Sequence, residues 1–415
     1  MKRYGTPQLV ICAAWAVLVS VAAARGADAS GRDLPPTPVA PPVTSTLTTL
    51  PSPAAPPNQS AASPASAYTN AQALSASTTG PRPSRQWRIV QAARPNRSAV
   101  AITPFVQACG TSLCLNGTTW QLYGATIYAG YDDPAGRIAL AKSAGLNTLR
   151  LVNFIDPADT MADLAVVKNW IRLDLIIADA HASGLRVILD LSDYRNLLVK
   201  AGRNPYTTDW GPFLQTVADR INTVSGLRYR DDPTIALVSF SGEVEPIKSP
   251  KNVLGVTTGE VTDFFRRTFA EWRSFDPNHL MSTGGLGQLD WPSGVDWRSI
   301  MALPGSDVCS IIAYGDSTTS TIPSEVESYC GTLGRPWITE EFGTPIKIGD
   351  ASRAKWYGHV IQENRDHNSA GTAFWNLGPQ TIPDSFDVNP QSPILWAAVV
   401  SDAPGSPPRA ATSPS

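Results

Sequence analysis

Two short stretches of the sequence place carboxylates where an apolar run ends. One reads SFSGEVEP and carries Glu243 and Glu245; the other reads WITEEFG and carries Glu340 and Glu341. A protonated carboxyl group can donate a proton to a leaving oxygen, whereas an ionised one can attack carbon or activate water. Two such groups facing one cleft would supply both halves of a hydrolytic reaction without a cofactor.

The elements that must position these carboxylates follow a repeated helix–glycine–strand pattern. In residues 143–154, 182–194 and 368–378 an amphipathic segment ends in Ser/Ala-Gly, and a short apolar run follows at once. Glycine just past a helix provides a left-handed cap, and a continuous apolar run is typical of a buried parallel strand. Eight strands alternating with helices over about 300 residues predict a (β/α)8 TIM barrel that begins with a short β-hairpin. The alternative is a doubly wound open sheet, but the sequence after the first strand is not the expected glycine-rich phosphate loop.

Strand alternation separates the four glutamates. Catalytic side chains lie at the C-terminal ends of barrel strands, and alternate residues of each strand point inward. The pattern around Glu243 directs large apolar residues toward the helices and Glu243 inward. In the second stretch it directs Ile338, Glu340 and Phe342 toward the helices and Glu341 inward. About three βα units of roughly 30 residues each lie between the two inward glutamates, which places them across the barrel mouth from each other.

Other residues at strand ends and in loops could serve the same cleft. The remaining strands end in Arg150, Asp190, Ser192, Tyr314 and Trp375. Aromatic residues in the expected βα loops could stack on sugar rings, although packing is their more common role: Tyr128, Tyr131, Tyr194, Tyr206, Trp210, Trp291 and Trp297. Two carboxylates facing a cleft rimmed by aromatics is the arrangement that glycosidic bond cleavage requires. Glu340 is then expected to be a structural ion-pair partner and Glu245 a rim residue that can contact substrate.

Six motifs in order resemble glycoside hydrolase family 5, the endoglucanase and endo-β-mannanase family, over about residues 105–380. They are FVQACGTSLCLNGTTWQLYGA, NTLRL, RDDPTIALVSFSGEVEP, DPNHLMSTGG, GRPWITEEFG and TAFWN. The DDPTI, DPNHL and EEFG segments are most similar to the mannanase branch.

This resemblance implies a role for each matching residue. Glu243 would be the general acid/base and Glu341 the nucleophile of a retaining mechanism, with carboxyl groups about 5 Å apart. Arg150 and Tyr314 would hydrogen-bond Glu341 and hold it ionised. Trp375 would form the platform under the sugar at the cleavage point. No metal and no cofactor is implied.

The chain departs from the family pattern at two positions. Most of the family has Asn before the acid/base glutamate, where this chain has Gly242. That Asn binds the sugar 2-hydroxyl, a contact that strengthens in the transition state. The family also tends to have His two residues before the tyrosine at the end of strand 6, where this chain has Ile312. Both departures bear on rate and substrate, and they leave the two carboxylates in place.

The N-terminal part of the chain predicts secretion. Basic residues, an apolar run at 9–24 and small residues after it are typical of a signal peptide, assigned to residues 1–29; an uncleaved anchor is the alternative. Residues 30–85 are rich in Pro, Ser, Thr and Ala and predict a disordered linker. The folded domain is assigned to 86–403 and a disordered tail to 404–415.

The cysteines agree with an oxidising compartment. Four remain after the signal segment, and they allow three pairings, of which Cys109–Cys114 with Cys309–Cys330 is favoured. A zinc site is the competing interpretation, but the chain has no CxxC motif and its four histidines are scattered.

The charge balance bears on partners. The formal net charge of −2 gives no electrostatic reason to expect nucleic acid or an anionic membrane as a partner. The sequence therefore predicts a secreted, monomeric β-1,4-glycanase acting on polysaccharide, with mannan the first substrate and cellulose-type glucan the second. An exo-β-glycosidase, and a carbohydrate-binding or wall protein with weak catalysis on the same scaffold, are the alternatives.

Overall fold

The computed structural model describes residues 104–128, 133–152, 154, 167–240, 244, 256–286, 295–314 and 322–404. The expected signal segment and linker, and the expected tail apart from its first residue, lie outside these residues. Three residues of the predicted site also lie outside them: Gly242, Glu243 and Glu245.

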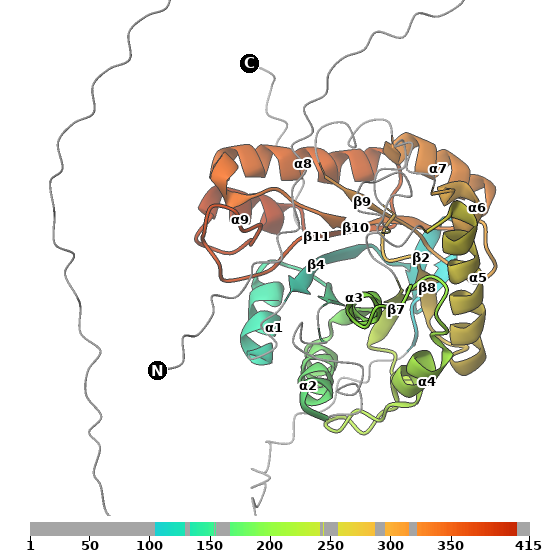
Figure 1. The fold of residues 1–415 in the computed structure, drawn as a ribbon. Helices are drawn as coiled ribbons and strands as arrows, with labels where there is room; N and C mark the ends of the chain where they lie inside the picture. Colours follow the sequence, from blue (N-terminus) through green and yellow to red (C-terminus); the bar gives the residue numbers. More distant parts are fainter. Residues whose placement is uncertain are drawn as a thin grey trace, which may run out of the picture. The chain divides into compact units, whose positions relative to one another are not determined.

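Eight parallel strands form the centre of the fold (Figure 1). In chain order they are β4 (Leu122–Tyr128), β5 (Thr148–Val152), β6 (Arg186–Asp190), β7 (Ile235–Ser239), β8 (Leu280–Ser282), β9 (Cys309–Ala313), β10 (Trp337–Phe342) and β11 (Gly371–Phe374). They pair in the spatial order β8-β7-β6-β5-β4-β11-β10-β9. A parallel bridge between Leu286, just after β8, and Ile311 of β9 joins the two ends of this sheet. The predicted (β/α)8 barrel is confirmed.

Helices surround the strands and bury a continuous apolar layer against them (Figure 1). They are α1 (Pro134–Ser143), α2 (Val167–Ser183), α3 (Asp193–Lys200), α4 (Gly211–Asp219), α5 (Thr258–Phe275), α6 (Trp297–Met301), α7 (Ile322–Thr332), α8 (Asp350–Asp366) and α9 (Pro393–Ser401). The start of α5 is fixed by a capping box. The Thr257 hydroxyl accepts a hydrogen bond from the backbone amide of Glu260, and the Glu260 carboxylate accepts one from the backbone amide of Thr257.

The glycine caps predicted after helices hold in two of three cases. Gly145 follows α1 and Gly184 follows α2, with φ of +71° and +74°. The third prediction was wrong: after α8 the left-handed residue is Asn368, at φ +50°, and Gly371 begins β11 instead. A Cβ at Gly371 would lie 2.3 Å from the Cβ of Leu122, so this glycine permits close approach of two strands.

A three-stranded antiparallel sheet precedes the barrel, at the place where the sequence predicts a short β-hairpin. Its strands are β1 (Gln107–Cys109), β2 (Ser112–Leu115) and β3 (Thr118–Thr119). Leu113 and the partly buried Trp120 from this segment pack with Leu122, Leu237 and Ile338 of the strands in a separate apolar cluster. The hairpin thus covers an apolar interior at the N-terminal end of the barrel.

Two disulfides are present, in the pairing that the sequence favours. Cys109–Cys114 joins β1 to β2, and Cys309–Cys330 joins β9 to α7. Among the described residues, no helix is both long and apolar enough to span a membrane. Within the same ranges, no group of three or more His, Cys, Asp or Glu side chains is placed to hold a metal ion.

Candidate active site

Glu341, at the C-terminal end of β10, is held by two donors from other strands. A guanidinium NH of Arg150 on β5 donates to Oε2, and the hydroxyl of Tyr314, just after β9, donates to Oε1 at 2.5 Å. The Glu341 residue is only 8% exposed. Both oxygens of one carboxylate are therefore held by hydrogen bonds from residues of other strand ends.

Arg150 is buried among three carboxylates. It is 2% exposed and pairs with Asp190 at 2.6 Å, with Glu340 at 3.4 Å and with Glu341. Burial lowers the pKa of Arg150, but the fields of Asp190, Glu341 and Glu340 together raise it well above its ordinary value. Arg150 is thus a fixed positive charge beside the candidate nucleophile.

Asp190, at the end of β6, orients this arginine. Its carboxylate accepts from Arg150, from the Ser239 hydroxyl at 3.3 Å and from the backbone amide of Ser192 at 2.8 Å. The sequence identified Asp190 as a polar strand end but gave it no role. Its position on the strand beside Arg150 is the signal that could have assigned one.

Glu340 also faces the barrel interior, and the predicted direction of this side chain was wrong. Ile338 packs in the inner apolar cluster, whereas Thr339 hydrogen-bonds Asn364 on α8 at 2.7 Å, which is the reverse of the expected alternation. The register between β9 and β10 shifts between Thr339 and Glu341, so that an extra residue is inserted there. This β-bulge turns Glu341 inward next to Glu340. Two residues keep their expected directions: Glu341 points inward, and Phe342 packs outward on Tyr357 of α8.

The surroundings of Glu340 fit the expected structural role. It is fully buried, accepts from the Ser282 hydroxyl at 2.8 Å and lies beside Arg150. Burial raises the pKa of Glu340, while Arg150 opposes that shift. Since Glu340 has no solvent-exposed surface, it supports Arg150 and is poorly placed to react.

Trp375 lies just after β11 and is partly exposed. Its ring centroid is 4.9 Å from that of Tyr128, a 37% exposed residue at the end of β4. The Tyr357 hydroxyl donates to the Trp375 carbonyl at 3.1 Å, and the Trp375 amide donates to the Phe342 carbonyl at 2.6 Å. The pair offers an aromatic surface at the same end of the barrel as Glu341.

The other loop aromatics have packing roles where the structure describes them. Tyr194, Tyr206, Trp210 and Trp297 are each at most 5% exposed, while Tyr131 and Trp291 lie outside the described residues. Phe386, which no sequence pattern singled out, packs edge-on against Tyr314 with centroids 6.1 Å apart.

Ile312, a residue that departs from the expected family pattern, is packed in the structure. It is 7% exposed, and a Cβ at Gly285 would lie only 2.4 Å from its Cγ2 atom. The wall beside Tyr314 is therefore apolar at this point and offers no side-chain donor.

The strand that leads to Glu243 keeps its expected alternation as far as it is described. The Ser239 hydroxyl reaches Asp190 inside the barrel, whereas Phe240 packs outward on Phe269 and Trp272 of α5.

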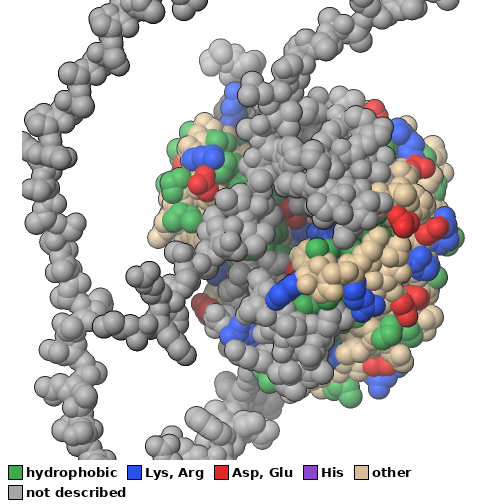
Figure 2. Space-filling model, in the orientation of Figure 1, with side chains coloured by type: hydrophobic (Ala, Val, Ile, Leu, Met, Phe, Trp, Pro, Cys, Tyr) green, Lys and Arg blue, Asp and Glu red, His purple; other side chains and the backbone are tan. Residues whose placement is uncertain are grey.

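Figure 2 shows one face of the molecule, on which Lys/Arg and Asp/Glu side chains are intermixed over the described surface.

These features define a class of protein, a (β/α)8 barrel with an arginine-held glutamate and aromatic residues at the C-terminal ends of its strands. The chain matches no family model. It is 24% identical over 357 residues to "Mannan endo-1,4-beta-mannosidase 1" of Oryza sativa subsp. japonica, a match that covers 68% of this chain and 81% of the relative.

Solved structures show the same fold. An endo-1,4-beta-mannanase from Rhizomucor miehei has a TM-score of 0.62 at 21% identity, covering 72% of this chain and 98% of that one. A glycoside hydrolase family 5 mannosidase from the same organism has a TM-score of 0.54 at 14% identity, covering 72% and 97%. The predicted resemblance to the mannanase-like branch of this glycoside hydrolase family is confirmed.

Proposed function

We propose that this protein is a secreted, retaining endo-β-1,4-mannanase in which Glu341 is the nucleophile and Glu243 the general acid/base. The observation that carries the proposal is the pair of donors, Arg150 and Tyr314, fixed on the two oxygens of Glu341. The mannosidase name of its relative supports mannan as the substrate.

The geometry of the described residues fits the first half of such a reaction. The ionised Glu341 carboxylate would attack the anomeric carbon while Glu243 protonates the leaving oxygen, giving a covalent glycosyl-enzyme. In the second half Glu243 would take a proton from water, which displaces Glu341 from the sugar. Arg150 would hold Glu341 in place through their ion pair, and the aromatic surface of Trp375 and Tyr128 would support the sugar ring.

The proposal is tested by reducing-sugar release from mannan and carboxymethyl-cellulose. Wild-type protein is expected to act on mannan, and Glu341→Gln should abolish release. Glu325→Gln is the matched control, because Glu325 is an exposed carboxylate on α7 that pairs only with Arg298 at 3.1 Å in the described structure. Faster release from carboxymethyl-cellulose would instead support the glucanase alternative.

Product size and mass separate the remaining alternatives. An endo-enzyme gives mixed oligosaccharides at early times, whereas an exo-β-glycosidase gives monosaccharide from the start. Binding to mannan without turnover would favour the non-catalytic alternative, for which the apolar Ile312 is the supporting feature among the described residues. The proposal includes action as a monomer, which a molar-mass measurement in solution checks.

A further inference from the structure

The segment after β11 brings Phe386 into the candidate active site. The Phe386 residue is partly exposed, and its ring packs edge-on against Tyr314, with an angle of 83° between the ring planes. A Cβ at Gly343, two residues after Glu341, would lie 3.3 Å from the Cδ1 atom of this ring. Phe386 therefore lies beside the strand end that carries Glu341 and against the tyrosine whose hydroxyl donates to it at 2.5 Å.

Arg353, on α8, holds the backbone of this segment. Its Nη2 atom donates to the carbonyl of Phe386 and to that of Asp387, each at 2.9 Å, and its Nη1 atom donates to the Ser392 hydroxyl at 3.4 Å. The Arg353 residue is fully buried. Two of its hydrogen bonds thus fix the backbone at the residue that contacts Tyr314 and at the next one.

The environment of Arg353 is unusual for a buried cation. None of the carboxylates that the structure describes forms an ion pair with it, and its Nε atom has no hydrogen-bond partner. Burying a charge without a counter-ion costs free energy, which an apolar side chain of similar size would avoid. Packing alone therefore gives no reason for an arginine here, whereas its hydrogen bonds to the Phe386 segment do.

Tyr357, one turn later on the same helix, supports the other aromatic residue on this side of the site. Its hydroxyl donates to the carbonyl of Trp375 at 3.1 Å. Burial raises the pKa of Tyr357 to about 12, so the hydroxyl keeps the proton that it donates. Two buried residues of α8 therefore hold the backbone of Trp375 and of Phe386.

Other hydrogen bonds also hold the segment and limit the effect that Arg353 can have. The backbone amides of Ile346 and Lys347, in the short helix η4 (Ile346–Ile348), donate to carbonyls of the segment at 2.8 Å each. These bonds remain when Arg353 is changed. We therefore expect the Phe386 ring to lose its fixed position while the segment as a whole stays in place.

We propose that Arg353 is a positioning residue for the reaction, which holds Phe386 against Tyr314 and so aligns the Tyr314 hydroxyl with Glu341. This inference rests on the proposed function, in which Glu341 is the nucleophile. Contacts between aromatic rings contribute free energy beyond the area that they bury, and they fix the angle between the rings. Loss of the contact should therefore weaken the same hydrogen bond that Tyr314→Phe removes.

The first test is a double-mutant cycle on an aryl β-mannobioside, with each variant assayed at a temperature where circular dichroism shows it to be folded. Arg353→Met should lower kcat about tenfold, a coupling of the size found between interacting residues. In the Tyr314→Phe background the same substitution should change kcat by less than about twofold, because the hydroxyl that Arg353 aligns is gone. An unchanged kcat in Arg353→Met, or a loss of similar size in both backgrounds, would overturn the proposal.

Two further variants separate the hydrogen bonds of Arg353 from the substitution itself. Arg353→Lys should retain most of the activity, because Nη2 alone makes both carbonyl bonds and an ammonium group has three donors. Arg365→Met is the matched control and should have the wild-type kcat, since Arg365 lies on the same helix with its side chain 48% exposed. If Arg353→Met does not fold, Phe386→Leu removes the ring contact directly and should show the same dependence on Tyr314.

A second readout does not depend on turnover. In protein labelled with 3-fluorotyrosine, the fluorine NMR resonance of Tyr314 is assigned by its loss in Tyr314→Phe. Arg353→Met should shift and broaden this resonance, whereas Arg365→Met should leave it unchanged. A wild-type protein without turnover would overturn the proposed function, whereas an unchanged Tyr314 resonance in Arg353→Met would overturn this inference, so the two failures are distinguishable.

Discussion

The two ends of the barrel interior differ in chemistry. At the C-terminal end, Arg150 is buried among Asp190, Glu340 and Glu341. At the N-terminal end the interior is apolar, with Ile338 and Leu237 packed under the hairpin. Buried charges often contribute little net stability, whereas apolar burial is the main favourable term in folding. The comparison predicts that substitutions at the C-terminal end change activity, whereas substitutions at the N-terminal end change stability and leave activity intact.

The largest effect is expected from Arg150→Leu, which leaves three buried carboxylates without their shared cation. The free energy of unfolding should fall by about 3–5 kcal/mol, and kcat by about a thousandfold, because Glu341 loses its charged donor. Urea denaturation and mannan hydrolysis measure the two effects. Arg298→Leu is the control, since its side chain is 51% exposed and its ion pair is at the surface. An unchanged kcat in Arg150→Leu would show that Arg150 does not support the reaction, and so would contradict the assignment of activity to this end of the barrel.

Ile338→Ala tests the other end. Removing this fully buried side chain should lower the free energy of unfolding by about 2–5 kcal/mol. Because Ile338 packs in the apolar cluster under the hairpin and lies three residues before Glu341 on β10, kcat at a temperature where the variant is folded should change by less than about twofold. A large fall in kcat with intact folding would show that the two ends are not separable.

Tyr314→Phe should have an intermediate effect on activity alone. It removes one hydrogen bond to a charged carboxylate, worth about 1.5–3 kcal/mol, so kcat should fall about 10- to 100-fold. The ring remains to pack against Phe386. Thermal denaturation should show little change, and a wild-type kcat would argue that this hydroxyl does not support the reaction.

The smallest effect is the pH dependence of stability due to Glu340. Burial raises the pKa of Glu340 above its ordinary value. A carboxyl group whose pKa is raised in the folded protein stabilises the fold at pH values below its ordinary pKa, where it is protonated. That contribution is lost as the pH rises through the raised pKa. The free energy of unfolding of wild type minus that of Glu340→Gln should therefore decrease from acidic to neutral pH. A difference that increases over this range would contradict the assignment.

The sequence predicted the barrel and the strand ends that meet around Glu341, because both follow from local patterns. Helix–glycine–strand units identified the strands, and polar residues at strand ends identified Arg150, Tyr314, Glu341 and Trp375. The direction of Glu340 could not be predicted in the same way. It depends on the bulge between β9 and β10, which is a property of pairing between strands and not of one strand.

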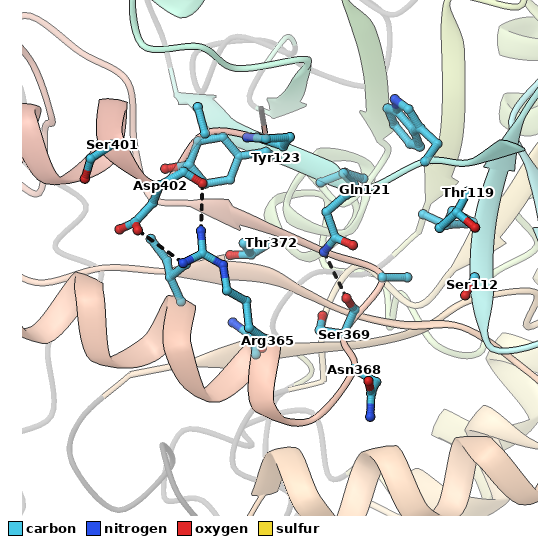
Figure 3. Close-up of a pocket in the computed structure, with 18 residues that line it drawn as sticks. Ser112, Thr119, Gln121, Tyr123, Arg365, Asn368, Ser369, Thr372, Ser401 and Asp402 are labelled. Carbon is cyan, nitrogen blue, oxygen red and sulfur yellow. Dashed lines mark hydrogen bonds and ion pairs between the residues drawn. The ribbon is translucent and has the colours of Figure 1, made fainter. Parts of the chain in front are cut away.

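A pocket at the N-terminal end of the barrel could not be predicted from the sequence for a related reason (Figure 3). Its lining comes from the hairpin, from the residues that begin β4 and β11, and from α8 and α9, segments that are far apart in the chain. Only the packed structure brings them together around one cavity.

The central claim is that Glu341 is the nucleophile of a retaining enzyme, and azide rescue of Glu341→Ala tests it most directly. The variant should be inactive on an aryl β-mannobioside. Added sodium azide should restore turnover and give an α-linked mannobiosyl azide, because azide takes the place of the missing carboxylate opposite the leaving group. A β-linked azide product, or undiminished activity without azide, would contradict the assignment.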